Sequence, residues 1–227
     1  MLYVRNMNLT SGLRSFHKNL GIVGSLKSTV QSIKFGYLPG KILIGPKVFL
    51  DTKKGDIKFD KSGKFLFGCT AGGVSSPRLE PSKLSLQDDG TIRIEAEHRA
   101  RIGAGSTLHV CDGQFSMGDS YINARATIFC MDEISIGDDC AIAWNVHLLD
   151  ADRHSITRKN KKTIQKEPIS IKDNVWIGHD VSVKKGVTIG SGAVVASNSV
   201  VTNDVEQNCL VAGIPARPIE HNISWGQ

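Results

Sequence analysis

Aliphatic residues recur every six positions over the last third of the chain, and this period limits the possible folds more than any other feature. Six residues match neither the 3.6-residue turn of an α-helix nor the two-residue alternation of a strand. The period is typical of short strands and tight turns that alternate, with aliphatic side chains pointing inward. Two registers show it: Ile171, Ile177, Val183, Ile189, Val195 and Val201, and Ile169, Val175, Val181, Val187, Ala193, Ser199 and Val205.

Three such units close one triangular coil, so residues eighteen positions apart should stack in successive coils. Ile171 is then predicted to lie against Ile189, and Ile177 against Val195. Stacked coils hydrogen-bond at the strand spacing of about 4.8 Å. The same spacing continues upstream through Ile122, Ile128, Ile134, Cys140 and Val146. The sequence therefore predicts an all-β solenoid, whereas a β-sandwich would not explain six consecutive matches at period six.

Breaks in the period divide the chain into three parts. Residues 92–211 are expected to form the β-helix, and the polar stretch 150–168 should leave it as a protruding loop. Residues 1–91 are expected to form irregular early coils and a small N-terminal cap, mostly helical over residues 1–35. Residues 212–227 should form a C-terminal tail or plug, with Trp225 folding back onto the solenoid.

Composition restricts the partners and the compartment. The net charge of +6 favours anionic partners but does not choose among them. Aromatic residues make up only 6% and no nucleic-acid motif is present, so nucleic acid is not an expected partner. The five cysteines are scattered without a CxxC pair, which disfavours disulfides and zinc. Without a signal-like or membrane-spanning apolar run, the chain is expected to be cytoplasmic, with no integral membrane contact.

Four segments together resemble the hexapeptide-repeat acyltransferases, especially the galactoside and maltose O-acetyltransferases and the capsule polysaccharide O-acetyltransferases. They are residues 174–178 (NVWIG), 186–190 (GVTIG), 199–205 (SVVTNDV) and 211–219 (VAGIPARPI). The resemblance implies a left-handed parallel β-helix, a homotrimer, and acetyl transfer from acetyl-CoA to a hydroxyl of a sugar or of a capsular or lipopolysaccharide-type polysaccharide, without a metal. An N-acetyltransferase acting on an amino sugar, or a non-catalytic β-helix binding module, remains an alternative.

Acetyl transfer to a hydroxyl needs a general base, and neutral imidazole is the usual one near pH 7. His154 stands at the start of the excursion, at the position that matches the general base of the family. Asp152, or a nearby backbone carbonyl, is a candidate to orient the ring of His154. A zinc hydratase is disfavoured, because the expected pair of histidines five positions apart within the coils is missing.

The remaining candidate residues lie along the coils and the excursion. By resemblance, the acetyl-CoA site comprises Trp176, His179, Ser197, Thr202, Asn203 and Arg217. Asn123 matches an acceptor-binding asparagine of the sugar acetyltransferases, and His147 should point outward, into the cleft or towards a neighbouring subunit. Arg153 begins a basic stretch that either is simply solvated or attracts an anionic acceptor.

Overall fold

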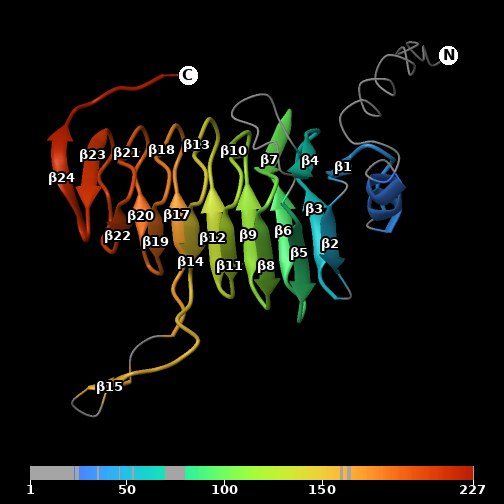
Figure 1. Ribbon diagram of the computed structural model, residues 1–227, viewed down its shortest axis with the longest axis horizontal. Coiled ribbons are helices and arrows are strands. Elements are labelled where there is room, and N and C mark those ends of the chain that lie inside the picture. Colours follow the sequence, from blue (N-terminus) through green and yellow to red (C-terminus); the bar gives the residue numbers. More distant parts are fainter. Residues whose placement is uncertain are drawn as a thin grey trace.

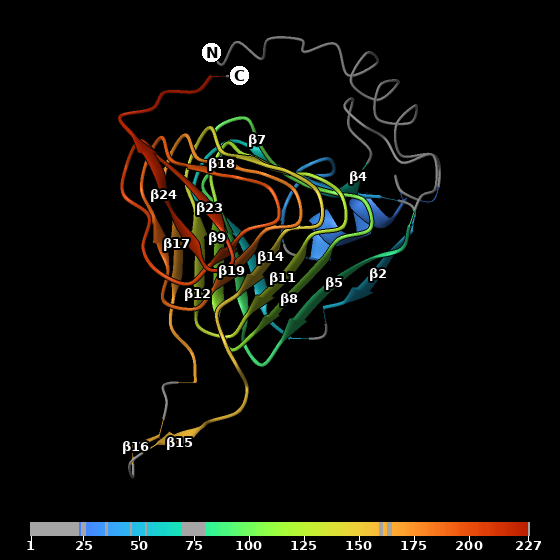
Figure 2. The ribbon, with the colours of Figure 1, turned by 60° about the vertical axis from the view of Figure 1, so that its left-hand side comes forward.

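The computed structural model describes residues 23, 26–34, 36–45, 47–52, 54–69, 80–158, 161–162 and 165–226. Within these residues the chain winds into a triangular prism whose faces are three sheets of mainly parallel strands (Figure 1, Figure 2). Consecutive strands join the three sheets in turn, and each strand pairs with the corresponding strand of the next coil. The predicted parallel β-helix is confirmed.

The three sheets are named A, B and C in the order in which the chain visits them. Sheet A contains β1 (Ile42–Ile44), β4 (Lys64–Cys69), β7 (Arg99–Gly103), β10 (Tyr121–Ile122), β13 (Ala141–Ile142), β18 (Trp176–Ile177), β21 (Val194–Val195), β23 (Cys209–Gly213) and β24 (Ala216–His221). Sheet B contains β2 (Val48–Asp51), β5 (Ser82–Gln87), β8 (Thr107–Cys111), β11 (Thr127–Cys130), β14 (His147–Leu149), β19 (Ser182–Lys184) and β22 (Val200–Val201). Sheet C contains β3 (Asp56–Phe59), β6 (Thr91–Ile94), β9 (Gln114–Met117), β12 (Glu133–Ile136), β17 (Ile169–Ile171) and β20 (Thr188–Ile189).

The strand register reproduces the stacking predicted from the eighteen-residue repeat. Ile171 pairs with Ile189, and Ile177 pairs with Val195. All four side chains are at most 1% exposed and belong to one continuous core that runs along the prism. Burial of each such side chain contributes about 1.5–3 kcal/mol relative to exposure, so the column of aliphatic residues is the main source of stability.

The corner between sheets A and B is turned in four successive coils by a non-glycine residue in the left-handed backbone conformation. The φ angles are 60° at Arg125, 59° at Asn145, 57° at Asp180 and 62° at Asn198. Short polar residues adopt this conformation at lower cost than other side chains, which explains why Asn and Asp predominate there. Because the corners superpose from coil to coil, side chains at this edge form a continuous row.

The corner between sheets C and A is held by a ladder of carboxylates. Asp173 accepts a hydrogen bond from the backbone N–H of Asp138 at 2.8 Å, and Asp138 accepts one from the N–H of Asp119 at 2.7 Å. A Cβ atom at Gly137 would collide with the Asp173 carboxylate, and one at Gly118 with that of Asp138. Glycine therefore follows the last aliphatic residue of these strands because the next coil approaches too closely for any side chain.

The coils begin at Ile42, since β1 to β6 already belong to the three sheets. A helix over residues 26–34 covers the free edge of β1. Ser28 Oγ accepts a hydrogen bond from the Ile44 N–H at 2.7 Å, and Ser32 Oγ accepts one from the Ile42 N–H at 3.1 Å. These contacts satisfy backbone donors that an uncovered edge strand would leave unpaired. The rest of the expected N-terminal cap, residues 1–22, lies outside the described residues.

At the opposite end, β24 turns back and pairs antiparallel with β23. Beyond it, Trp225 Nε1 donates a hydrogen bond to the Asn174 carbonyl at 2.8 Å, and the Trp225 ring lies 6.0 Å from that of Trp176. The predicted return of Trp225 onto the solenoid is confirmed. Within the described residues, no helix has both the length and the apolar character needed to cross a membrane.

Candidate active site

Residues 150–168, called the arm from here on, leave the prism between β14 and β17 and project far beyond its surface (Figure 1, Figure 2). The arm includes a small antiparallel pair, β15 (Thr157–Arg158) and β16 (Lys161–Lys162). Ile136 pairs with Ile171, which is thirty-five positions later in the chain. Ile171 pairs with Ile189 at the regular spacing of eighteen positions. The arm is thus an insertion into one corner of an otherwise regular coil.

The first residue of the arm fixes it to the coil below. Asp150 is fully buried, and its carboxylate accepts hydrogen bonds from the backbone N–H groups of Met131 at 2.9 Å and Asp132 at 2.8 Å. Burial raises the pKa of Asp150, although the two N–H donors act in the opposite direction. Lys166, at the end of the arm, donates to the Met131 carbonyl at 2.9 Å. The outgoing and returning segments at the base of the arm, called the stem from here on, are therefore both attached to the turn at Met131.

Asp152 also belongs to this stem. Lys185 Nζ lies 3.2 Å from a carboxylate oxygen of Asp152 and 3.3 Å from one of Glu167, so it joins the outgoing and returning strands of the arm. The backbone N–H of Asp152 donates to the Gln165 carbonyl at 2.9 Å. The carboxylate proposed from sequence to orient the imidazole of His154 thus pairs with Lys185.

Two predicted residues follow Asp152 at the base of the arm. Arg153 has a φ of 62°, and its guanidinium lies 5.4 Å from the centre of the Phe129 ring on sheet B. His154 comes next and is exposed. The left-handed turn and the cation–π contact fix the backbone immediately before His154. The imidazole is therefore presented to solvent from an anchored position rather than from a free loop.

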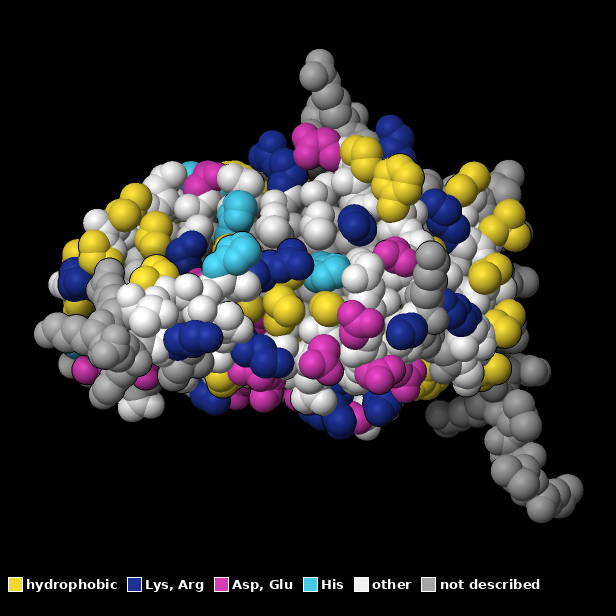
Figure 3. Space-filling view, turned by 90° about the horizontal axis from the view of Figure 1, so that it is seen from below, with side chains coloured by type: hydrophobic (Ala, Val, Ile, Leu, Met, Phe, Trp, Pro, Cys, Tyr) yellow, Lys and Arg dark blue, Asp and Glu magenta, His cyan; other side chains and the backbone are white. Residues whose placement is uncertain are grey.

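The outer face of sheet B carries further imidazoles, and His109 was not singled out from the sequence. Its ring stacks on Phe129 at 4.9 Å with an angle of 14°. Burial, followed by the charges of Lys83 and Arg153, lowers the pKa of His109, so its neutral form prevails near pH 7. His147 lies outward on the same sheet and is half-buried, as predicted. The view from below shows histidines gathered among lysines and arginines near the middle of that face (Figure 3).

The corner between sheets A and B carries two stacked rings. Trp144 and His179 lie in neighbouring coils, with ring centres 4.9 Å apart and an angle of 4° between their planes. His179 Nδ1 lies 2.7 Å from Asp180 Oδ2. The next coil places Ser197 beside them, so close to Gly178 that no Cβ atom would fit there. His179 and Ser197, eighteen positions apart, thus lie at the same corner of neighbouring coils. Trp144 is a further ring at this corner that the sequence did not single out.

Two other predicted residues lie on or beside sheet A. Trp176 points outward from β18 and is 46% exposed. Asn123 follows β10, and its side-chain oxygen accepts a hydrogen bond from the Ala124 N–H at 2.8 Å. Asn123 is thus held at the same corner as Trp144, one coil before it.

The last coils bring together the residues expected to hold the nucleotide end of the donor. Asn203 and Arg217 line one pocket of about 280 Å³ beneath β24. Thr202 Oγ1 donates to Asn203 Oδ1 at 3.0 Å, and Arg217 donates to the Ala216 carbonyl at 2.8 Å. The guanidinium keeps further donors for a phosphate. Among the described residues, no group of three or more His, Cys, Asp or Glu side chains is placed to hold a metal ion.

Comparisons with known proteins place the chain in a family. Residues 168–203 match the bacterial transferase hexapeptide family, which is described by six repeats. An uncharacterized 24.8 kDa protein in the cps region of Klebsiella pneumoniae is 34% identical over 188 residues, which cover 81% of each chain. The polysialic acid O-acetyltransferase of Escherichia coli O1:K1 is 43% identical over 96 residues, covering 41% of this chain and 31% of that protein.

A crystal structure of another polysialic acid O-acetyltransferase shares the fold, with a TM-score of 0.50, 21% identity, and coverage of 82% of this chain and 87% of that one. The coils therefore form a left-handed parallel β-helix, as the resemblance implied. A putative acetyltransferase of Dictyostelium discoideum is 34% identical over 150 residues, which cover 64% of this chain and 75% of that protein. The chain belongs to the hexapeptide-repeat acetyltransferases.

Proposed function

We propose that the protein transfers the acetyl group of acetyl-CoA to a sugar hydroxyl of a polysaccharide, and that His154 is the general base. The observation that carries the proposal is the anchored presentation of His154 by a stem whose carboxylates are already paired, Asp152 and Glu167 with Lys185 and Asp150 with the Met131 N–H. The named E. coli relative acts on polysialic acid, which supports a polysaccharide acceptor. The reaction takes place in the cytoplasm, where acetyl-CoA is available.

In the reaction, the acceptor hydroxyl oxygen attacks the thioester carbonyl carbon while His154 takes the hydroxyl proton. The carbon–sulfur bond then breaks, and the leaving thiolate receives the proton back from the imidazolium. The products are the acetyl ester and CoA. A positioned imidazole contributes about 10²–10⁴-fold to such a step.

The residues present fit the acetyl donor. Trp144 and His179 form a flat platform, and Ser197 continues the same edge towards the last coils. At the end of the prism, Arg217 and Asn203 line a polar pocket suited to the anionic nucleotide end. The donor is therefore expected to extend along the prism, with the pantetheine arm against the ring platform.

The arm and the ring platform lie at opposite edges of sheet B. Asn145 marks one edge and Asp150 the other, and the five residue-to-residue steps of extended chain from one to the other span about 16 Å. The arm also projects away from its own prism (Figure 2). His154 follows Asp150 at the base of the arm, at the edge of sheet B opposite to that of Trp144 of the same protomer. This geometry supports a homotrimer in which each site combines the platform of one protomer with the arm of the next.

The test of the base is a His154→Ala variant assayed by release of the CoA thiol in the presence of a glycan panel. Turnover should fall about 10²–10⁴-fold. The variant should keep the oligomeric mass of the wild-type protein in light scattering. His221→Ala is the matched control, because this exposed histidine contacts Glu206 near the C-terminus and is not part of the arm. Unchanged turnover in His154→Ala would remove His154 from the mechanism.

The composite site is tested by mixing two inactive variants, His154→Ala and Trp144→Ala. The two variants are refolded together in equal amounts. A site is intact when its arm comes from a Trp144→Ala protomer, which keeps His154, and its platform comes from a His154→Ala protomer, which keeps Trp144. Random assembly of cyclic trimers gives about a quarter of all sites this composition. Recovery of activity towards that fraction is expected. A mixture no more active than its parts would show that base and platform come from one protomer.

A further inference from the structure

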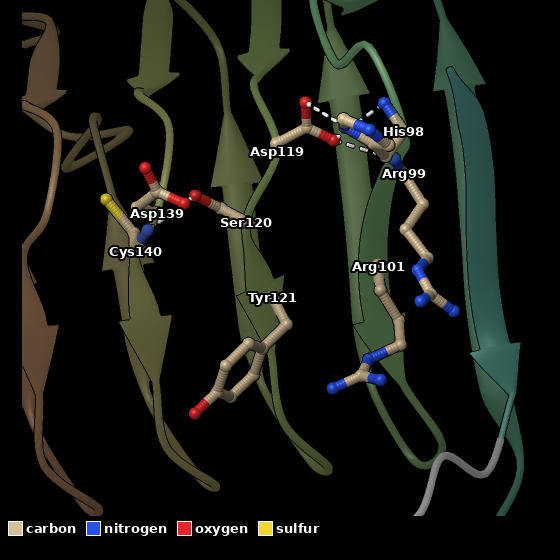
Figure 4. A pocket seen from close by; sticks show the side chains of 8 residues that line it. All are labelled: His98, Arg99, Arg101, Asp119, Ser120, Tyr121, Asp139 and Cys140. Atoms are coloured by element: carbon tan, nitrogen blue, oxygen red, sulfur yellow. Dashed lines mark hydrogen bonds and ion pairs between the residues drawn. The ribbon is translucent and has the colours of Figure 1, made fainter. Parts of the chain in front are cut away.

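A pocket of about 410 Å³ opens on sheet A, in the coils that precede the donor site, and none of its residues has a part in the reaction above. Its lining includes His98, Arg99 and Arg101 from β7 and the residues just before it, and Tyr121 from β10. Arg101 lies 5.0 Å from the centre of the Tyr121 ring. In Figure 4 the side chains of Arg99 and Arg101 extend on the same side, away from Asp119.

The cations of this pocket lie next to one another, whereas neighbouring positions of a sheet usually avoid like charges. Lys64 on β4 is the direct neighbour of Arg99 on β7, and Arg101 follows two residues later on the same face. Like charges in neighbouring positions are destabilising. Burial, followed by the charge of Arg99, lowers the pKa of Arg101. Among the ion pairs found within the described residues, none includes Arg99 or Arg101.

The carboxylates nearby do not neutralise these arginines. Asp119 accepts hydrogen bonds from the backbone N–H groups of Glu97 at 2.8 Å, His98 at 2.9 Å and Arg99 at 2.7 Å. Partial burial would raise the pKa of Asp119, but these donors lower it. The carboxylate of Asp119 is thus hydrogen-bonded to the backbone of the turn before β7. Asp139 lies one coil further on, beside Ser120 and Cys140 (Figure 4).

The pocket lies in line with Trp176, which precedes His179 of the donor platform by three residues in the same coil. Along one row of sheet A, Arg101 pairs with Tyr121, Tyr121 with Ala141, and Ala141 with Trp176. At the strand spacing, Arg101 is about 14 Å from Trp176 along the prism. Ala141 has only a methyl group, so the surface of sheet A is lower at this position than at Tyr121 and Trp176 on either side. An extended chain lying over Ala141 would touch Tyr121 on one side and Trp176 on the other.

We propose that Arg99 and Arg101 bind an anionic group of the acceptor glycan, a carboxylate or a phosphodiester, and so hold the acceptor chain along sheet A with a hydroxyl near Trp176. The proposal rests on the acetyl-transfer function above and specifies its substrate as an acidic glycan. Each guanidinium has several N–H donors in one plane, the geometry that suits bidentate contact with either anion. Tyr121 supplies a ring face for the sugar beside the charge.

The test compares three acceptors in the full-length protein: an oligosaccharide containing uronic acid, one linked by phosphodiesters, and a neutral malto-oligosaccharide. The variants are Arg101→Gln and Arg99→Gln, and Arg99 is exposed, so its replacement should leave the fold intact. Arg93→Gln is the matched control, since Arg93 pairs with Asp60 at 3.0 Å on sheet C. CoA release measures transfer, and calorimetry measures acetyl-CoA binding separately.

The wild-type protein should acetylate one anionic acceptor better than the neutral one. Arg101→Gln and Arg99→Gln should then raise KM for that acceptor about 10- to 100-fold, the loss expected for a charged hydrogen-bonded contact. Acetyl-CoA binding should stay unchanged, and Arg93→Gln should behave like the wild-type protein. Which anionic acceptor responds identifies the carboxylate or the phosphodiester as the ligand.

Two results would overturn the pocket while leaving acetyl transfer intact. One is a preference for the neutral acceptor, and the other is an unchanged KM in both arginine variants. If acetyl-CoA binds but none of the three acceptors is acetylated, the pocket proposal fails, because neither anionic glycan is then a substrate. If acetyl-CoA does not bind, the proposed function fails, whatever the pocket does.

Discussion

Asp150 connects the stability of the prism to the position of the proposed base, so its replacement tests both. The side chain is fully buried, and its carboxylate receives the N–H groups of Met131 and Asp132. In Asp150→Ala, two partly buried backbone donors lose their acceptor. Each unsatisfied donor costs about 1–3 kcal/mol, so the variant should lose about 2–4 kcal/mol after the stem relaxes.

Asp150→Asn separates the hydrogen bonds from the charge. The amide keeps one acceptor oxygen and removes a buried negative charge, so the expected loss is smaller, about 1 kcal/mol. Because burial raises the pKa of Asp150, the folded protein binds more protons than the unfolded chain just above the ordinary pKa of 3.8. Stability from this group therefore falls as the pH rises through that window. The asparagine variant should lack this decrease.

Thermal unfolding at fixed protein concentration measures these effects, and for a chain of this length 1 kcal/mol shifts Tm by about 2–4 °C. Asp150→Ala should melt roughly 5–15 °C below the wild-type protein and lose turnover, because the stem no longer holds His154. Asp152→Asn is the control, since its carboxylate is 58% exposed and its pair with Lys185 contributes at most about 1 kcal/mol. An Asp150→Ala variant as stable and as active as Asp152→Asn would refute the anchoring role.

Two further predictions concern the prism and its sheet B face. Gly137→Ala drives a Cβ atom into the Asp173 carboxylate and should cost about 1–3 kcal/mol in thermal unfolding, whereas Gly226→Ala, with open space around it, should cost almost nothing. Equal melting temperatures would contradict the close approach at that corner. The pKa of His109 lies below its ordinary value of 6.5, so the unfolded chain binds more protons below that pH and stability from this group is lost on acidification. His109→Gln should flatten the fall in Tm below pH 6.5, and an unchanged profile would show that His109 does not contribute.

The coils could be predicted in detail because the signal is periodic and local. A six-residue period assigns each aliphatic residue to the interior, and the eighteen-residue repeat then fixes its partner, as Ile171 with Ile189 and Ile177 with Val195 show. The outward direction of Trp176 and His147 follows from the same alternation. In a solenoid each coil contacts only its neighbours, so local patterns determine the tertiary structure to an unusual degree.

The parts that could not be predicted depend on contacts outside the period. The arm separates Trp144 from His179 by thirty-five positions, so the eighteen-residue rule does not pair them although their rings stack. In the sequence Asp150 is simply the first polar residue of a loop. Only the structure shows that its carboxylate is buried and accepts hydrogen bonds from the backbone. Arg101 is an ordinary strand residue until Lys64 and Arg99 are seen beside it.

The same physics explains why the chemistry lies at the corners and faces rather than in the coils. Inward positions are filled by aliphatic side chains that stack on the next coil, and a polar replacement there would leave a buried group unpaired. A corner, in contrast, accepts an insertion as long as the backbone groups of the interrupted turn find partners. Asp150 and Lys166 supply those partners for the turn at Met131, so the coils before and after the arm keep their register. The arm can therefore leave the prism and present the imidazole of His154 at its base without changing the register of the coils, because the backbone groups of the interrupted turn find partners where the arm begins.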